Sequence, residues 1–354
     1  MKRNETRLVK IGDLELGASN KILIQSMCNI KTSRTDEVIA QINECERLGA
    51  DLMRVSVLDK DDAYALKKIT SSINIPLVAD IHFSKELAIL SILNGAKKIR
   101  LNPGNLKNVD EIKEIIELAK KHNVAIRVGV NGGSLDEDIK KEFPNDKEST
   151  LIVKSALKYA QILEDLDFHN IVISLKSTNV FTTIEAYREF SKISDYPLHI
   201  GLTESGFDEI GIIRSCAALS PLLLEGIGNT IRISLTSDPY KEVKTCKRLL
   251  HDLNLYDNYP TLISCPTCGR CKVNPKPLAI KTLKFLEDNN INLKVAIMGC
   301  VVNGIGEGKS ADIGLAGGDK SYIIFKNGEV LKTVQEENAL DELFSEILKM
   351  SKEK

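Results

Sequence analysis

The chain has 354 residues, with 48 Lys and Arg, 49 Asp and Glu, eight cysteines and a formal net charge of −1. This length suits one large domain and a smaller one, and the balanced charge excludes binding to nucleic acid or to an anionic membrane through bulk electrostatics. Abundant cysteines without an apolar N-terminal signal segment favour free thiols in a reducing compartment. No apolar run is long enough to span a bilayer. We therefore expect a cytoplasmic protein.

The first 250 residues carry a repeating pattern. A short hairpin around Gly12-Asp13 comes first, and apolar strand patterns then alternate with amphipathic helical patterns such as 35–48, 109–122 and 151–163. The eight expected strands are 22–26, 52–57, 76–81, 97–102, 124–130, 170–175, 197–202 and 230–235. Eight such units predict an α/β fold of the TIM (β/α)8 barrel type, with a doubly wound sheet as the lesser alternative.

The pattern breaks at residues 254–260, where we place a domain boundary. Beyond it we expect strands at 293–298 and 311–315, helices at 277–287 and 336–349, and a hairpin at Asn327-Gly328. The predicted domains are therefore a barrel over 1–253 and a small α+β domain over 261–354.

Two short cysteine motifs mark the second domain. The first runs Cys265-Pro-Thr-Cys268-Gly-Arg-Cys271, and the second places Cys300 among glycines seven residues before Glu307. Thiolates at this spacing can hold an iron-sulfur cluster or a zinc ion. Three interpretations stay open: three cysteines with Glu307, an all-sulfur site that uses Cys271, and a structural zinc site.

Polar side chains follow the strand ends of the predicted barrel, where TIM-barrel active sites lie. The candidates are Arg54, Asp80, His82, Arg100, Asn102, Arg127, Asn131, Lys176, His199, Thr203, Glu204, Arg232 and Ser234. Five cations exceed the two acids, which predicts a phosphate or diphosphate substrate held by arginine forks.

Individual members of this set have plainer interpretations. A single strand arginine commonly pairs with a neighbouring carboxylate, and His82 and His199 can serve as core hydrogen-bonding groups. Asp80 can simply orient an arginine. Glu204 is the better acid-base candidate because it follows a strand end in a loop with glycines on both sides.

The motifs at 78–83, 99–104, 128–134, 199–204 and 226–232, followed by the two cysteine motifs, occur in an order that resembles the bacterial 4-hydroxy-3-methylbut-2-enyl diphosphate synthase family. The resemblance covers nearly the whole chain. It implies a substrate-binding barrel joined to a cluster domain like those of sulfite and nitrite reductases.

The resemblance also implies the chemistry. The substrate would be 2-C-methyl-D-erythritol 2,4-cyclodiphosphate, opened and dehydrated with two electrons from flavodoxin or ferredoxin in isoprenoid precursor biosynthesis. A [4Fe-4S] cluster would be held by Cys265, Cys268, Cys300 and Glu307, with Glu204 as proton donor, and the active site would need a homodimer. Three positions depart from the family pattern: Ile305, Asn229 and Cys271.

A rival function of a different class is a zinc-stabilised barrel that acts as a phosphosugar isomerase or aldolase. A weaker alternative is an electron-transfer module without catalysis. Metal analysis of protein purified without air discriminates between the two functions: iron with sulfide supports the cluster, and zinc supports the rival.

Overall fold

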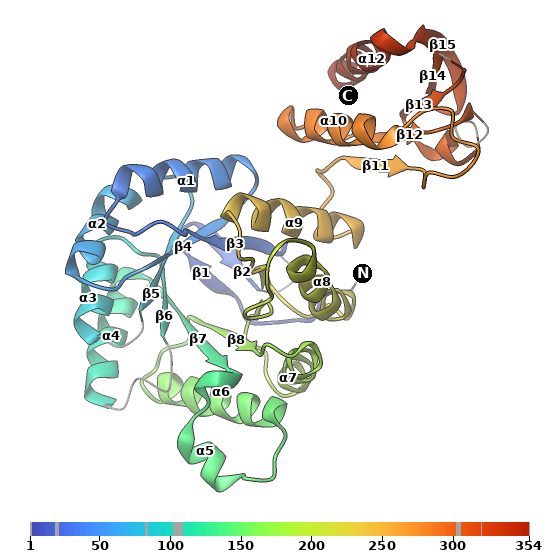
Figure 1. Cartoon of the computed structure of the whole chain (residues 1–354). Coiled ribbons are helices and arrows are strands. Elements are labelled where there is room, and N and C mark those ends of the chain that lie inside the picture. The colour runs from blue at the N-terminus through green and yellow to red at the C-terminus, as the bar shows by residue number, and fades with distance from the viewer. Residues whose placement is uncertain are drawn as a thin grey trace. The chain divides into compact units, whose positions relative to one another are not determined.

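The computed structural model describes residues 2–17, 21–81, 84–101, 109–301, 306–319 and 321–353. The chain divides into two compact units, Met1–Leu255 and Tyr256–Lys354, each with its own sheet (Figure 1). His82, Asn102 and Ile305 lie outside the described residues, and so does the side chain of Glu307.

The first unit contains an eight-stranded parallel sheet in the order β8-β7-β6-β5-β4-β3-β10-β9. Its strands are β3 (Leu23–Met27), β4 (Leu52–Ser56), β5 (Leu77–Ile81), β6 (Lys98–Leu101), β7 (Ala125–Asn131), β8 (Ile171–Lys176), β9 (His199–Ile200) and β10 (Thr230–Ile231). An isolated parallel bridge between Ile173 and Leu198 brings the two ends of the sheet together. The sheet is thus a nearly closed barrel, which confirms the predicted fold class.

Helices follow the strands because each connection between parallel strands must cross over. They are α1 (Thr35–Arg47), α2 (Lys60–Thr70), α3 (Lys85–Leu93), α4 (Val109–His122), α5 (Glu137–Glu142), α6 (Glu148–Asp165), α7 (Val180–Ile193), α8 (Asp208–Leu224) and α9 (Pro239–Asp252). The predicted helix at 109–122 is confirmed at both ends, and the predictions at 35–48 and 151–163 correspond to α1 and the longer α6.

A hairpin of β1 (Val9–Ile11) and β2 (Leu14–Leu16) closes the amino end of the barrel. Its buried Val9, Ile11 and Leu16 share one apolar cluster with Leu23 and Leu52, which begin β3 and β4. Apolar packing therefore fills the amino end of the barrel.

The last two predicted strands are shorter than expected. Ladder pairing covers only His199–Ile200 and Thr230–Ile231, so the extended predictions 197–202 and 230–235 were too long. After β9, Gly201 lies so close to the chain that a Cβ there would stand 2.7 Å from the Arg232 carbonyl oxygen. Because β10 ends at Ile231, Arg232 and Ser234 lie in the segment that follows it.

The second unit is a five-stranded mixed sheet in the order β11-β12-β13-β14-β15, with two parallel and two antiparallel pairings. Its elements are β11 (Thr261–Ser264), α10 (Pro275–Asp288), β12 (Lys294–Met298), β13 (Ile313–Gly317), β14 (Ser321–Lys326), β15 (Glu329–Gln335) and α12 (Ala339–Glu353). Asn327 and Gly328 join β14 to β15 with φ of 51° and 83°, as a tight hairpin turn requires. No described helix of either unit is long and apolar enough to cross a membrane.

Candidate active site

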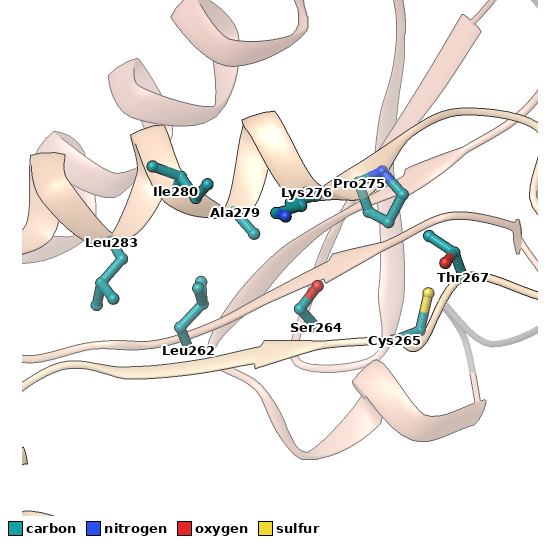
Figure 2. Close-up of a pocket in the computed structure, with 9 residues that line it drawn as sticks. All are labelled: Leu262, Ser264, Cys265, Thr267, Pro275, Lys276, Ala279, Ile280 and Leu283. Carbon is teal, nitrogen blue, oxygen red and sulfur yellow. The ribbon is translucent and has the colours of Figure 1, made fainter. Parts of the chain in front are cut away.

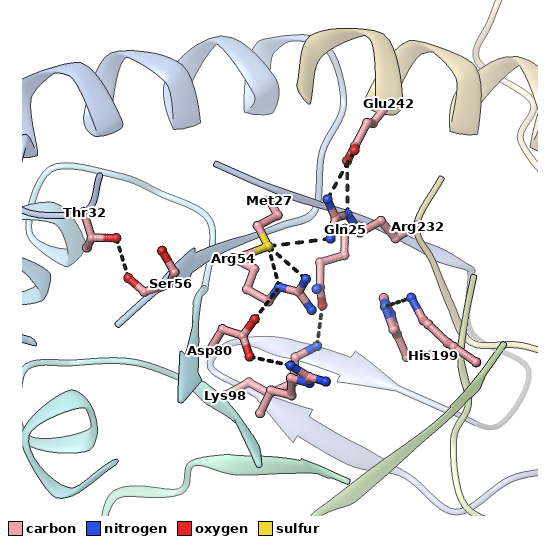
Figure 3. A network of polar contacts seen from close by, with 12 residues as sticks. Gln25, Met27, Thr32, Arg54, Ser56, Asp80, Lys98, His199, Arg232 and Glu242 are labelled. Atoms are coloured by element: carbon pink, nitrogen blue, oxygen red, sulfur yellow. Dashed lines mark hydrogen bonds and ion pairs between the residues drawn. The ribbon is translucent and has the colours of Figure 1, made fainter. Parts of the chain in front are cut away.

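The carboxyl ends of the barrel strands, here called the barrel mouth, hold a buried ion network (Figure 3). Arg100 on β6 donates from Nη1 to Asp80 Oδ1 on β5 at 3.0 Å, and Arg54 Nε on β4 lies 3.6 Å from Asp80 Oδ2. Burial disfavours the charged carboxylate, but the positive charges of Arg54, Arg100 and Arg127 outweigh burial and hold the pKa of Asp80 well below its usual range. Asp80 therefore contacts two arginines, as in the plainer interpretation of this residue, and its predicted part in substrate binding stays a prediction.

Arg232 is held by a carboxylate that sequence reasoning missed. Glu242, in the first turn of α9, accepts hydrogen bonds from Arg232 Nε at 3.1 Å and Nη2 at 3.2 Å. It also accepts from Ser26 Oγ at 2.6 Å and from the Leu235 backbone N–H at 2.9 Å. Its side chain is 3% exposed, so this carboxylate is fully engaged inside the protein. The acid follows a Pro at a helix start, a signal of helix capping that could have marked it.

Methionine sulfur fills the space between two of these arginines. Arg54 donates to Met27 Sδ from Nε and Nη2 at 3.0 and 2.8 Å, and Arg232 Nη1 lies 3.6 Å from the same sulfur (Figure 3). A thioether is only a weak acceptor. These guanidinium N–H groups therefore make only weak hydrogen bonds and stay available to a stronger acceptor.

Arg127 and Lys176 have no carboxylate partner among the described residues. Arg127 is 2% exposed, and its Nε and Nη1 have no hydrogen-bond partner in the described ranges. Lys176 Nζ lies 3.4 Å from His199 Nε2, and His199 Nδ1 lies 2.7 Å from Thr230 Oγ1. Burial, with the nearby arginines, lowers the pKa of Lys176, and burial with Lys176 lowers the pKa of His199. Within the part of the chain that the structure describes, the barrel mouth thus contains two buried cations that form no ion pair.

Two glycines make room for these cations. A Cβ on Gly129 would stand 3.1 Å from Arg100 Nε, and one on Gly201 would stand 2.6 Å from Lys176 Nζ. Deeper in the barrel, buried Lys98 donates to Gln25 Oε1 at 2.8 Å, a pair that the sequence reading did not single out.

The remaining predicted residues lie at the rim. Asn131 ends β7, Thr203 donates its backbone N–H to the Ser177 carbonyl, and both are half-buried, as is Ser234. Glu204 is exposed, with φ of 51° in the left-handed region, which is uncommon for a residue other than glycine. The structure places Glu204 on the loop after β9 and does not test its predicted role.

Asn229, a departure from the family pattern, has a structural position. Its Oδ1 accepts from the Leu198 backbone N–H at 2.9 Å, and its Nδ2 donates to Thr6 Oγ1 at 3.2 Å. The amide thus ties β9 to the N-terminal segment.

Four cysteines of the second unit, Cys265, Cys268, Cys271 and Cys300, are here called the thiol site. The Gly299 backbone N–H donates to Cys265 Sγ at 3.1 Å, and a Cβ on Gly299 would stand 2.6 Å from Cys271 Sγ and 3.5 Å from Cys265 Sγ. Only glycine leaves both sulfurs room at this point. Hydrogen bonds from the Arg270 backbone and side chain lower the pKa of the exposed Cys268.

The donor chemistry of the thiol site fits a soft metal centre. Free thiols, a backbone N–H bonded to sulfur and a glycine that clears space are features of thiolate-ligated clusters. Across the described ranges, which omit 302–305 and the Glu307 side chain, no three metal-binding side chains are already gathered for an ion. The set therefore fits in chemistry, and the ligand assignment stays a prediction.

Comparisons with known proteins cover both units. The family model described as the GcpE TIM-barrel domain matches residues 6–247, and the GcpE protein C-terminal domain matches residues 261–349. A 4-hydroxy-3-methylbut-2-en-1-yl diphosphate synthase (flavodoxin) of Malacoplasma penetrans is 48% identical over 341 residues, covering 96% of this chain and 94% of its own. The synthase of the same name from Caldanaerobacter subterraneus is 49% identical over 351 residues, 99% of each chain.

Two solved structures resemble about 70% of this chain in fold. A dihydropteroate synthase from Stenotrophomonas maltophilia has a TM-score of 0.52 at 12% identity, over 71% of this chain and 98% of its own. The dihydropteroate synthase of Thermus thermophilus has a TM-score of 0.51 at 13% identity, over 70% of this chain and 98% of its own. At these identities only the fold is shared.

Proposed function

The chain belongs to the GcpE family, and from this membership and the barrel mouth we propose how its two units carry out the family's reaction. The chain is an oxidoreductase of isoprenoid precursor biosynthesis, which opens and dehydrates 2-C-methyl-D-erythritol 2,4-cyclodiphosphate reductively to (E)-4-hydroxy-3-methylbut-2-enyl diphosphate. Its relatives do not favour the zinc-dependent isomerase or aldolase alternative.

The observation that supports the substrate assignment most strongly is the unbalanced charge at the barrel mouth. Among the described residues, Arg127 has two buried nitrogens without a hydrogen-bond partner, and Lys176 Nζ makes its hydrogen-bonding contact with the neutral ring of His199. A buried cation without a counter-charge is costly, so a bound diphosphate would relieve that cost. We assign Arg127 and Lys176 to the diphosphate.

The paired arginines have a different part in this proposal. Asp80 fixes Arg54 and Arg100, and Glu242 fixes Arg232, while the weak sulfur contacts leave guanidinium nitrogens free to meet phosphate oxygens. Orientation before binding lowers the entropy lost when the substrate binds. His82, Asn102, Asn131, His199, Thr203 and Ser234 remain proposed substrate-binding residues.

The thiol site supplies the redox half of the proposal. Cys265, Cys268, Cys300 and Glu307 would hold a [4Fe-4S] cluster, which when bound stores electrons and offers an iron as Lewis acid. Overall, two electrons enter, the ring C–O bond to phosphate breaks, and one hydroxyl leaves as water. Glu204 would deliver the proton from its carboxyl group to that leaving hydroxyl.

Partners follow from the same reaction. The relatives' names give flavodoxin as the electron donor; we propose flavodoxin or ferredoxin for this chain, in the cytoplasm. We also propose a homodimer, because the barrel mouth and the thiol site belong to separate compact units of one chain, and a second copy could bring them together.

The test is conversion of the cyclodiphosphate by protein purified without air. The wild type with reduced flavodoxin should release 4-hydroxy-3-methylbut-2-enyl diphosphate, detected by phosphorus resonance and mass. It should contain iron and sulfide, and a Cys265→Ser variant should lose both, whereas Cys216→Ser, a half-buried cysteine of α8, should keep them. Wild-type protein that contains zinc without iron and forms no product would refute the proposal.

A further inference from the structure

An apolar groove runs along the second unit and ends at the thiol site (Figure 2). It has a volume of about 360 Å³ and lies between β11 and α10, with Leu262, Cys265, Pro275, Lys276, Ile280 and Leu283 among its lining residues. Ile280 is 60% exposed and, with Leu262 and Leu283, makes this surface apolar. We call this surface the carrier groove.

The groove lies at an open edge of the sheet. β11 is the first strand in the order β11-β12-β13-β14-β15 and pairs only with β12 among the described strands. Leu262 and Ser264 are two residues apart on β11, so both side chains face the groove, and α10 forms the other wall. The surface is therefore accessible from outside the second unit.

The chain around the groove has a charge unlike the chain as a whole. From Thr261 to Phe285 there are five cations and no acidic residue, whereas the full chain has a net charge of −1. The five cations are all exposed and are Arg270, Lys272, Lys276, Lys281 and Lys284. Lys276 and Lys284 form no ion pair with any residue in the described ranges. Lys276 lines the groove, and Lys281 and Lys284 follow its lining residues Ile280 and Leu283 on α10. An apolar surface beside such cations is complementary to a partner with acidic groups around an apolar patch.

The groove also leads to redox chemistry. Cys265 lines its end (Figure 2). The Cys265 sulfur accepts the Gly299 N–H and shares the space over Gly299 with Cys271. A protein that binds here would place its own redox group next to the thiol site. Steering by opposite charge would raise the rate of encounter.

We propose that the carrier groove is the docking surface for an acidic electron-carrier protein. The proposal rests on the proposed function and adds where the donor binds. Each docking event would oxidise the reduced carrier by one electron, and two events would supply the two electrons that the reaction consumes. The apolar floor gives contact area, and the lysines set orientation and association rate.

The test reverses the charges of two exposed lysines on α10, the helix that forms one wall of the groove. Lys276→Glu with Lys284→Glu is compared with Lys113→Glu with Lys121→Glu, two exposed lysines at the same spacing on α4. The dissociation constant for flavodoxin is measured by titration calorimetry, and turnover is measured with flavodoxin and with reduced methyl viologen, a small donor that needs no docking. A third variant, Ile280→Gln, probes the apolar floor.

We expect the groove variant to bind flavodoxin at least about tenfold more weakly at low salt, with a smaller difference at about 0.5 M salt because screening weakens charge pairing. Turnover with methyl viologen should stay within about twofold of the wild type, and the α4 variant should bind flavodoxin normally. Ile280→Gln should weaken binding independently of salt.

Unchanged affinity of the groove variant for flavodoxin would overturn the proposal. Equal loss with both donors would also overturn it, because the groove would then serve the reaction itself. Dissociation of a dimer with flavodoxin affinity retained would assign the groove to contact between copies of the chain. The binding measurement decides this question even if the wild type forms no product, so failure here and failure of the proposed function are distinguishable.

Discussion

The barrel mouth and the thiol site contrast in how far each is assembled by the fold. The barrel mouth collects its charges from consecutive parallel strands, where Asp80 lies in register with Ser56 and Arg100, and Arg100 with Arg127. The thiol site draws its cysteines from two loops, and its side chains are not gathered around a metal in the described ranges. A binding site built on strands exists before its ligand, whereas one built on loops depends on its metal.

The largest expected effect concerns Glu204, which lies on the loop that follows β9, a strand of the barrel. Glu204→Gln should lower turnover by about 10²–10⁴-fold, because a positioned proton donor contributes that much. Substrate affinity and iron content should change little, since Gln keeps the size and shape of this exposed side chain. Single-turnover kinetics separate the two effects, and Glu209→Gln, exposed in the first turn of α8, is the control. Unchanged turnover would remove Glu204 from the mechanism.

Asp80 tests how strongly the barrel mouth is preassembled. Asp80→Asn should lower the free energy of unfolding by about 3–5 kcal/mol, because two buried arginines lose their carboxylate. Chemical denaturation measures this change, and Asp36→Asn, whose carboxylate is 84% exposed, should have little effect.

The pH dependence of this difference has a defined sign. The folded-state pKa of Asp80 is depressed, so its stabilisation is fully present above the unfolded pKa of about 3.9. The stabilisation is lost as pH falls from there toward the folded pKa. The gap between wild type and Asp80→Asn should therefore be constant from neutral pH to about pH 5 and shrink below about pH 4. A gap that widened on acidification would contradict the ion network.

A smaller effect is expected from Glu242, which acts through Arg232. Glu242→Gln should weaken cyclodiphosphate binding about tenfold, because a charged fork that fixes Arg232 is lost. In an Arg232→Ala background the same change should weaken cyclodiphosphate binding less than about twofold, because the arginine through which Glu242 acts is already absent. Glu225→Gln, at the exposed ion pair with Arg188, is the control. Equal losses in both backgrounds would indicate a general structural role.

The smallest expected effect concerns Cys271. Its sulfur shares the space over Gly299 with that of Cys265, but our assignment gives the ligands to the other three cysteines and Glu307. Cys271→Ser should therefore keep the iron and sulfide content of the wild type, measured by metal analysis and electron paramagnetic resonance. Loss of iron would instead favour the all-sulfur site.

The sequence predicted the strand-built part of the barrel mouth better than the contacts that other elements bring to it. Alternating apolar segments predicted the barrel strands within a few residues, and regular spacing predicted that Arg54, Asp80, Arg100 and Arg127 share the interior. Glu242 was missed because its carboxylate comes from a helix start and reaches Ser26 of β3 and Arg232 of the segment after β10, a tertiary contact without periodicity. Met27 was missed because a thioether carries no charge to suggest an arginine contact.

The central claim is that Arg127 and Lys176, the buried cations of the barrel mouth, bind the diphosphate of the substrate. One variant tests this claim, because it should lower substrate affinity and raise thermal stability. Arg127→Met should weaken binding of 2-C-methyl-D-erythritol 2,4-cyclodiphosphate about a hundredfold, because two charged hydrogen bonds are lost. The same variant should unfold at a higher temperature without ligand, because a buried charge without a partner is replaced by an apolar group of similar length. Weaker binding with higher stability is the result we predict; unchanged binding together with lower stability would show that Arg127 serves the fold alone and would contradict the account.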